Sequence, residues 1–305
     1  MLRARTVVRK SPRNWIMSSS NFSSKIFKSS WKPSLVVADW DETITLNDTI
    51  GIVAETAYIA KRNFSPSFDH FSRIYMDAYS RYLSDFKKKS GERNSIAQEE
   101  LFQQGMKSVE MTSIDAITKA GLFTGLTEEN FKDQASKVQI RPNFIEFVGK
   151  CKELAIPIVI LSINWTSILI KETLVQHGIN LDSSDIRIIV NEFEFEEDGK
   201  GHKVTSGSWR NDVSVRTAID KLDFLKSLKA SYKEILYVGD STTDLLAMLE
   251  SNVGVVMSGG SVLKVLDTLG IECTSDFISL GTNSSGTSCQ RLLTGGWKDI
   301  SSLLE

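Results

Sequence analysis

Short apolar runs recur along much of the chain, and longer stretches with helical periodicity separate them. The runs cover residues 35–38, 156–161, 186–190, 235–238 and 253–257. Short apolar runs bounded by turn residues are typical of buried strands, and helical stretches between them indicate parallel βαβ units. The pattern predicts an α/β fold built on a doubly wound parallel sheet.

Residues 46–137 interrupt this alternation because they contain no strong strand run. Aromatic residues there recur at intervals of three or four, on one face of a helix. They are Phe68, Phe71, Tyr75, Tyr79, Tyr82 and Phe86. Further helical stretches are expected at 99–107 and 113–120. The aromatic face either closes over a substrate or forms the core of the helical unit, and we favour the second interpretation.

We therefore expect two domains after a basic leader. Residues 35–45 and 138–305 would form the sheet domain, and residues 46–137 an inserted helical cap. Phenylalanine and acidic residues alternate around Asp198-Gly199, which predicts a β-hairpin over 192–203. A Ser-, Gly- and Thr-rich loop is expected over 274–288, and a closing helix within 292–304.

Polar residues follow three of the predicted strands directly. They are Asp39, Asp41 and Thr43 after the first run, Ser162 and Asn164 after the second, and Gly239, Asp240 and Asp244 after the run 235–238. Ligands of open α/β sheets bind at the carboxyl ends of the strands. Paired carboxylates there suit Mg²⁺, and an aspartate can also attack phosphorus. The sequence thus predicts a site for metal-assisted phosphate chemistry.

These segments together resemble the four motifs of the haloacid-dehalogenase superfamily of phosphohydrolases, over roughly residues 35–273. Asp39-Trp40-Asp41-Glu42-Thr43 resembles the first motif, Ser162 the second, Lys221 the third, and Gly239-Asp240 through Asp244 the fourth. The chain is most similar to the phosphoserine-phosphatase-like branch, whose fold is Rossmann-like with a helical cap. It also resembles the thiamin monophosphate phosphatase domain linked to thiaminase II in plants, and fungal relatives connected with cold tolerance.

The resemblance implies a role for each residue. Mg²⁺ would bind Asp39, Asp240 and the backbone carbonyl of Asp41. Asp39 would be the nucleophile and Asp41 the general acid and base. Ser162 and Lys221 would hold phosphoryl oxygens, with Lys203 and Lys226 as alternatives for the lysine. Asp244 would orient the lysine or support the metal, and Thr43, Asn164 and Gly239 would add further contacts.

Asp48 lies where the phosphoserine-phosphatase-like branch carries a glutamate that touches substrate, in the segment Asn47-Asp48-Thr49-Ile50. Its carboxylate would favour a cationic group on the substrate, or else would cap the helix that begins there. The expected function is Mg²⁺-dependent hydrolysis of a small phosphomonoester through an aspartyl-phosphate. The alternatives are a phosphotransferase or phosphomutase, and a non-enzymatic regulatory or stress-tolerance protein that retains the fold.

Charge is distributed unevenly along the chain. The formal net charge is −2, which gives no general attraction to nucleic acid. Residues 1–34 carry eight basic residues and no acidic ones, and they are rich in serine. This composition is typical of a mitochondrial transit peptide, so we expect a matrix protein whose mature form begins between about Ser18 and Ser34. A disordered basic leader, a start at Met17 and a cytoplasmic location are the alternatives.

Other sequence features exclude several classes of site. Cys151, Cys273 and Cys289 form no zinc or disulfide pattern, and the three histidines are not spaced as metal ligands. No apolar run reaches the eighteen residues typical of a transmembrane helix, so no membrane partner is expected. Neither oligomeric state nor the identity of the substrate can be predicted from these patterns.

Overall fold

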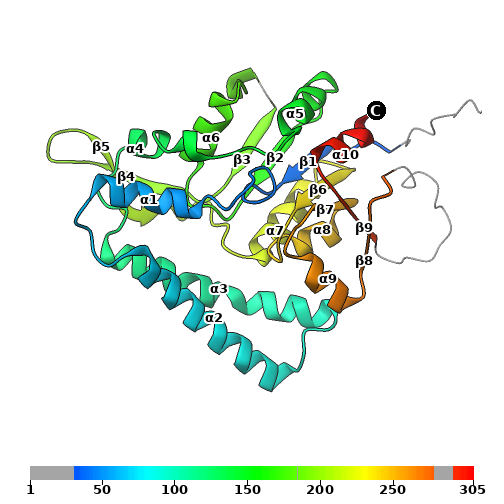
Figure 1. Ribbon diagram of the computed structural model, residues 1–305, viewed down its shortest axis with the longest axis horizontal. Helices are drawn as coiled ribbons and strands as arrows, with labels where there is room; N and C mark the ends of the chain where they lie inside the picture. Colours follow the sequence, from blue (N-terminus) through cyan, green and yellow to red (C-terminus); the bar gives the residue numbers. More distant parts are fainter. Residues whose placement is uncertain (1–30, 184, 278–290) are drawn as a thin grey trace, which may run out of the picture.

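A parallel sheet forms the centre of the computed structural model, which describes residues 31–183, 185–277 and 291–305 (Figure 1). The sheet has seven strands in the order β3-β2-β1-β6-β7-β9-β8, and all of its pairs are parallel. The strands are β1 (Leu35–Ala38), β2 (Ile158–Leu161), β3 (Ile186–Ile189), β6 (Ile235–Gly239), β7 (Val253–Met257), β8 (Glu272–Thr274) and β9 (Arg291–Gly295). The predicted fold class is confirmed.

Helices cover both faces of the sheet, because alternate residues of each strand point to opposite sides. Val36 and Ala38 of β1 join one apolar cluster, and Leu35 and Val37 join another. The first cluster includes residues from α5 (Phe144–Glu153), α6 (Ser167–Gln176) and α10 (Trp297–Ser301). The second includes residues from α7 (Ala218–Lys229), α8 (Leu245–Glu250) and α9 (Leu263–Leu269).

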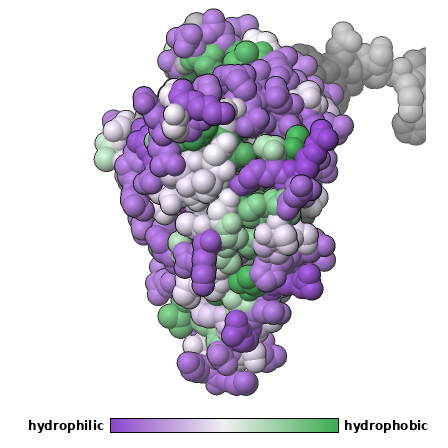
Figure 2. Space-filling model, turned by 90° about the vertical axis from the view of Figure 1, so that its left-hand side faces the viewer, coloured by the Kyte–Doolittle hydropathy of each residue, from purple (hydrophilic) through white to green (hydrophobic). Residues whose placement is uncertain are grey.

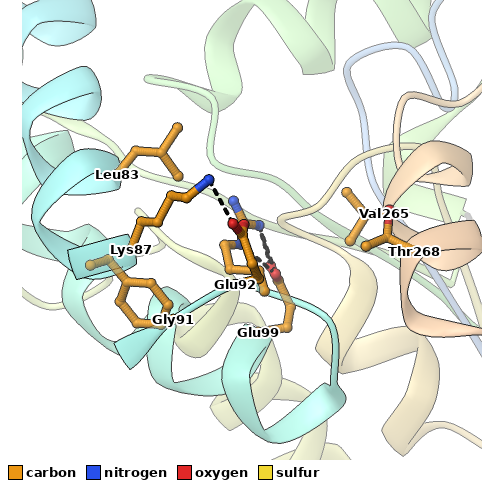
Figure 3. Close-up of a pocket in the computed structure, with 9 residues that line it drawn as sticks. Leu83, Lys87, Gly91, Glu92, Glu99, Val265 and Thr268 are labelled. Carbon is orange, nitrogen blue, oxygen red and sulfur yellow. Dashed lines mark hydrogen bonds and ion pairs between the residues drawn. The ribbon is translucent and has the colours of Figure 1, made fainter. Parts of the chain in front are cut away.

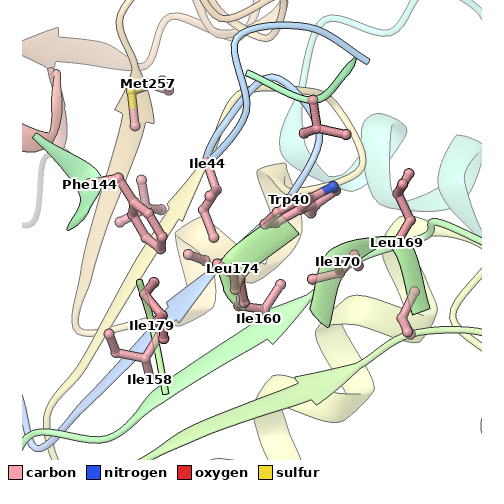
Figure 4. Packing of buried hydrophobic residues seen from close by; sticks show 14 of the residues in the cluster. Trp40, Ile44, Phe144, Ile158, Ile160, Leu169, Ile170, Leu174, Ile179 and Met257 are labelled. Atoms are coloured by element: carbon pink, nitrogen blue, oxygen red, sulfur yellow. The ribbon is translucent and has the colours of Figure 1, made fainter. Parts of the chain in front are cut away.

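The loop after β1 is anchored in the first cluster by its apolar side chains. Trp40 and Ile44 are fully buried and belong to the same cluster as Ile160 of β2 (Figure 4). The indole of Trp297 donates a hydrogen bond to the backbone carbonyl of Thr43 at 3.0 Å. Glu42 has a φ of 54°, which only a firmly held loop tolerates in a residue other than glycine. Packing therefore fixes the loop that carries the first two aspartates.

The helical segment leaves the sheet and returns to it at one place. Thr45 and Ile140 form an antiparallel bridge, next to which the backbone N–H of Leu46 donates to the carbonyl of Gln139 at 2.9 Å. Between them lie α1 (Ile50–Ala60), α2 (Phe68–Ser90), α3 (Ile96–Ala120) and α4 (Glu128–Lys132), followed by a 3₁₀ turn over Ala135–Lys137. The two stretches expected at 99–107 and 113–120 form the single helix α3.

These helices divide into two groups. Val53 of α1 and Phe131 of α4 are buried in the apolar cluster that includes β1, so both helices pack as part of the sheet domain. In contrast, α2 and α3 form a long antiparallel hairpin that extends below the sheet in Figure 1. We call this unit the α2–α3 hairpin. Of the four helices, α2 and α3 share an apolar cluster separate from that of the sheet domain within the described residues.

The aromatic face predicted on α2 is shared between two environments. Tyr79, Tyr82 and Phe86 pack around Phe102 of α3, inside the cluster that belongs to the hairpin. Phe68 and Phe71 are instead packed with the cluster of the sheet domain. The favoured interpretation, a core of the helical unit, therefore fits the distal half of this face.

Two further expectations concern the β-hairpin around Asp198-Gly199 and the C-terminal helix. The predicted hairpin consists of β4 (Phe193–Glu197) and β5 (Lys203–Trp209), and it is longer than the expected 192–203. The short closing helix expected within 292–304 is α10 (Trp297–Ser301), and residues 291–295 before it pair with β7 and β8 as strand β9. Most of the expected loop 274–288, Cys289, and residues 1–30 of the predicted leader lie outside the described residues.

Most of the surface turned to the viewer in Figure 2 is hydrophilic, with hydrophobic side chains in an interrupted band between charged ones. The exposed large apolar residues include Ile59 of α1 and Met76 of α2. Among the described residues, none of the helices combines the length and apolarity needed to cross a bilayer.

Candidate active site

The three predicted motif loops meet at the carboxyl edge of β2, β1 and β6, which are neighbours in the sheet. The hydroxyl of Thr43 donates to Asp240 Oδ1 at 3.1 Å, which joins the loops after β1 and β6. The amide nitrogen of Asn164 donates to Asp41 Oδ2 at 3.0 Å, which joins the loops after β1 and β2. The expected residues of these loops therefore lie in one place.

Lys221 completes this group from the first turn of α7. A capping box between Thr217 and Asp220 fixes the start of that helix. Lys221 has no exposed surface, and its Nζ lies 2.8 Å from Asp39 Oδ2 and 2.7 Å from Asp244 Oδ1. The alternatives Lys203 and Lys226 are exposed, and Lys203 pairs with Glu128 at 2.8 Å. Of the three lysines, only Lys221 lies beside the carboxylates.

Asp244 is held in place by hydrogen bonds to both of its oxygens. Its Oδ1 accepts from Lys221 Nζ at 2.7 Å and from the hydroxyl of Tyr237 at 2.8 Å. Its Oδ2 accepts from the backbone N–H groups of Asp240 and Ser241 at 3.3 and 3.2 Å. A Cβ at Gly239 would lie 2.4 Å from the Asp244 side chain. Glycine is therefore required where this carboxylate crosses the strand end.

Burial and mutual repulsion disfavour the ionised forms of these carboxylates. Burial, and secondly the negative charge of Asp244, hold the pKa of Asp39 well above its usual range. The same two causes raise the pKa of Asp240 to about 7. Burial acts to lower the pKa of Lys221, but Asp244 and Asp39 outweigh it and keep the pKa above the usual value. Three carboxylates thus share one lysine.

This excess of negative charge fits a divalent cation. Carboxylate oxygens of Asp39, Asp240 and Asp244 lie within 4.8 Å of one another. Asp240 Oδ2 accepts no hydrogen bond within the described part of the chain. Mg²⁺ prefers such oxygen ligands, and its charge would relieve the repulsion between them. The residues present therefore fit the expected metal.

The side chain of Asp41 is turned away from these three carboxylates. Its Oδ1 accepts from the backbone N–H and the hydroxyl of Thr49 at 2.7 and 2.6 Å, while Oδ2 accepts from Asn164. Burial, and secondly the charge of Asp48, raise the pKa of Asp41 to about 6. A metal contact from Asp41 is thus restricted to its backbone carbonyl. A pKa near 6 allows the side chain to give and to take a proton near neutrality.

Hydrogen bonds hold the loop after β2 in place. Ser162 Oγ accepts from the backbone N–H of Asn164 at 3.1 Å. The side-chain amide of Asn191 donates to the carbonyls of Asn164 and Val215, both at 2.8 Å. Sequence reasoning missed Asn191, Thr49 and Tyr237. The hydroxyl-bearing Tyr237 inside the otherwise apolar run 235–238 is the one sequence signal that could have pointed to it.

Asp48 differs from the other expected residues because it is exposed. Its Oδ1 accepts from the backbone N–H of Ile50 at 2.7 Å, at the start of α1. It also borders a cavity of about 380 Å³ between the α2–α3 hairpin and the motif loops. Asp48 therefore bonds to the first residue of α1 and also places a carboxylate beside the cavity, so both expected roles stay predictions.

A separate pocket of about 270 Å³ lies at the far end of the hairpin (Figure 3). Lys87 pairs there with Glu92, and Arg93 pairs with Glu99. Val265 and Thr268 of α9 form its opposite wall. None of the motif residues lines this pocket, so we do not associate it with the carboxylates.

Comparison with known proteins gives a family and several distant relatives. Residues 36–249 match the family described as haloacid dehalogenase-like hydrolases. Cold tolerance protein 1 of Saccharomyces cerevisiae is 24% identical over 248 residues, which cover 73% of this chain and 78% of that protein. The bifunctional TH2 protein, mitochondrial, of Arabidopsis thaliana is 23% identical over 270 residues, 78% of this chain but only 42% of that protein.

Solved structures show the same fold. The probable phosphoserine phosphatase from Vibrio cholerae superposes with a TM-score of 0.51 at 16% identity, covering 92% of this chain and 66% of that one. The expected resemblance to the phosphoserine-phosphatase-like branch is confirmed at the level of the fold.

Proposed function

Because the chain belongs to the haloacid dehalogenase-like hydrolases, we propose that it is a Mg²⁺-dependent phosphatase of a small phosphomonoester. The buried contact of Lys221 with Asp39 and Asp244, beside Asp240, carries this proposal. The cluster combines a carboxylate nucleophile, a fixed positive charge and an incomplete cation site.

In the first step, an oxygen of Asp39 attacks the phosphorus atom, and the bond between phosphorus and the ester oxygen breaks. Asp41 gives its proton to the departing alkoxide, which leaves as the alcohol. Lys221 and Ser162 hold the oxygens of the phosphoryl group during the transfer. The product is an aspartyl-phosphate on Asp39.

In the second step, water attacks the phosphorus atom of this aspartyl-phosphate while Asp41 takes a proton from the water. Inorganic phosphate leaves, and the carboxylate of Asp39 is restored. Bound Mg²⁺ would be held by Asp39, Asp240 and the carbonyl of Asp41, and it supplies charge neutralisation for the phosphate dianion. Asp244 keeps Lys221 in position throughout.

We propose a small metabolite phosphate as substrate, and thiamin monophosphate is our candidate compound. The cavity beside the motif loops has a volume of about 380 Å³, which suits a molecule of metabolite size. The resemblance of the loops after β2 and β6 to the phosphatase domain linked to thiaminase II supports thiamin monophosphate.

The test is release of inorganic phosphate by the purified protein, with and without Mg²⁺, from a panel of metabolite phosphates and a generic aryl phosphate. Acid quenching followed by mass spectrometry of the peptide with Asp39 should reveal the phosphorylated intermediate. Absence of release from every compound, with metal bound and the fold intact, would favour the non-enzymatic alternative.

We further propose that the protein acts in the mitochondrial matrix. The acid-free, Arg- and Ser-rich composition of residues 1–34 supports this location. The Arabidopsis relative is itself named as mitochondrial. N-terminal sequencing of protein from purified mitochondria should give a start between about Ser18 and Ser34, and an intact Met1 in a purely cytosolic pool would contradict it.

A further inference from the structure

Arg216 is a buried cation that the proposed phosphatase chemistry does not use. Only 7% of its surface is exposed, and its Nη1 has no hydrogen-bond partner. Its backbone N–H donates to Asp220 Oδ2 at 2.9 Å, so the capping box that positions Lys221 also positions Arg216. Its guanidinium lies 5.1 Å from the ring centre of Trp209. A buried donor without a partner is costly, which indicates a place for a ligand acceptor.

Glu110 of α3 faces the same cavity from the opposite side. Its Oε1 accepts from the hydroxyl of Tyr75 at 3.1 Å, and Oε2 accepts no hydrogen bond among the described residues. Arg216 and Glu110 influence each other electrostatically but form no ion pair within 4.0 Å in the described chain. A free donor and a free acceptor therefore line one cavity without satisfying each other.

The remaining wall is mainly apolar and aromatic. Phe68, Phe71 and Tyr75 of the hairpin contribute to it, as do Ile163 and Trp165 of the loop after β2. Ile163 and Trp165 flank Asn164, and Thr243 precedes Asp244, so the cavity opens beside the catalytic loops. A phosphate held at Lys221 would place its ester group in this cavity.

We propose that Arg216 and Glu110 select phosphomonoesters whose alcohol carries a planar, amino-substituted nitrogen heterocycle. A ring nitrogen accepts from the guanidinium of Arg216, and the neighbouring amino group donates to Glu110. The aromatic wall packs against the ring. This inference rests on the proposed phosphatase activity and names the substrate class for it.

An amino acid phosphate would also offer an acceptor and a donor, as carboxylate and ammonium. Its side chain is too small and too polar to cover Phe68, Phe71 and Trp165, and the cavity of about 380 Å³ would remain largely unfilled. The apolar wall therefore favours the heterocycle, and phosphoserine becomes a control substrate.

The test compares two matched pairs of phosphates that differ only in one amino or oxo group. The pairs are thiamin and oxythiamin monophosphate, and cytidine and uridine monophosphate. Exchange of amino for oxo converts the donor into an acceptor and protonates the adjacent nitrogen, so Arg216 and Glu110 would both face the wrong partner. In at least one pair, kcat/KM should be tenfold or more higher for the amino compound.

The variants are Glu110→Gln, which keeps the shape, and Arg216→Met, which keeps much of the volume. In Glu110→Gln the amino preference should fall to within about threefold, because an amide can donate or accept. Glu100→Gln on the exposed face of α3 and Arg81→Met on the exposed face of α2 are the matched controls and should retain the preference. If circular dichroism shows that Arg216→Met is not folded, the test of this inference rests on Glu110→Gln alone.

Calorimetry gives a readout that does not require turnover. Thiamin should bind the Asp39→Asn protein more tightly than oxythiamin, and Glu110→Gln added to it should abolish the difference. Hydrolysis without any amino preference, or a preference for phosphoserine over both pairs, would overturn this inference and leave the phosphatase proposal intact. No hydrolysis of any phosphate would overturn the phosphatase proposal first.

Discussion

The carboxyl edge of the sheet and the α2–α3 hairpin differ in whether their charged residues are buried or exposed. At the sheet edge, Asp39, Asp244 and Lys221 are buried and contact one another. Along the hairpin most charged residues are exposed, and the core is an aromatic cluster around Phe102. Buried charges require fixed partners, whereas an aromatic cluster tolerates changes of composition. We infer that the edge carries the proposed reaction and that the cavity beside the hairpin binds the substrate.

Among the ion pairs of the hairpin that the structure describes, one contains a fully buried charge. Glu99 has no exposed surface, and it accepts from Arg93 Nε and Nη2, both at 2.7 Å, and from Gln103 at 2.7 Å. Arg93 and Glu99 line the pocket shown in Figure 3. Lys107 also reaches Asp220 of α7 at 3.3 Å across an exposed gap. The hairpin thus contacts the sheet domain both through this polar pair and through apolar residues such as Phe71 and Ile117, which belong to the cluster of the sheet domain.

The largest effect is expected from Asp39→Asn. The carboxamide keeps the shape but is not a nucleophile, so phosphate release should fall by more than about a thousandfold. Thermal melting should show an equal or higher Tm, because the change removes one charge from a crowded cluster. Asp115→Asn on the exposed face of α3 is the control. Retention of more than a few per cent of activity would exclude Asp39 as the nucleophile.

Asp41→Asn should reduce kcat for a substrate with a poor leaving group by about 10²–10⁴-fold, since proton transfer is lost. An aryl phosphate with a good leaving group needs less protonation and should be affected less. Rapid-quench measurement of both substrates checks this difference. Equal rates for wild type and variant with the poor leaving group would remove Asp41 from the proton-transfer role.

Phe102→Ala tests whether the hairpin is stabilised separately. Phe102 is almost fully buried, and its ring centre lies 4.9 Å from that of Tyr82 and 5.2 Å from that of Phe86. Truncation of a buried phenylalanine costs about 3–5 kcal/mol. Hydrogen exchange should show lost protection in α2 and α3 but not in β1 and β6. Equal loss in both regions would mean that the molecule unfolds as one unit.

The partly buried Glu110 should make stability depend on pH. Burial raises its pKa to about 7, although Tyr75 and Arg216 act to lower it. A raised carboxyl pKa favours the folded state at low pH, and this contribution is lost as pH rises toward 7. Glu110→Gln should therefore gain stability relative to wild type between pH 5 and 8, on the order of 1–3 kcal/mol.

Denaturant unfolding at pH 5, 6, 7 and 8 measures this change for Glu110→Gln. Glu100→Gln is the matched control, and its difference from wild type should stay constant. A constant difference for Glu110→Gln as well would show that this carboxyl titrates in its ordinary range.

The smallest effect is expected from Asp48→Asn. Asparagine also caps helices, so α1 should remain intact while the charge is lost. Because Asp48 is exposed, an interaction with a cationic substrate is worth only about 0–1 kcal/mol. KM for thiamin monophosphate should rise a few-fold more than KM for a neutral aryl phosphate. Asp69→Asn serves as control, and equal changes for both substrates would leave Asp48 as a helix cap alone.

Local patterns in the sequence determined the elements that carry the reaction. The apolar run 35–38 is bounded by Ser34 and Asp39, and β1 occupies these same residues. The carboxyl ends of neighbouring parallel strands lie together, so the meeting of Asp39, Asn164 and Asp240 could be predicted once these strands were taken as neighbours, and the strand order β2-β1-β6 confirms it. Where local signals were weaker, details were missed: α3 is one helix rather than two stretches, and strand β9 was not predicted.

Contacts between distant segments were decided only by the tertiary structure. Tyr237 and Asp244 meet because a strand end and the following turn fold back on each other. Glu110 and Arg216 face one cavity because the α2–α3 hairpin lies across the motif loops, and neither residue stands in a recognisable motif. Apolar periodicity fixes which face of an element is buried, since burial depends on local spacing. The partner of a buried polar group depends on which elements pack together, and local spacing carries no information about that.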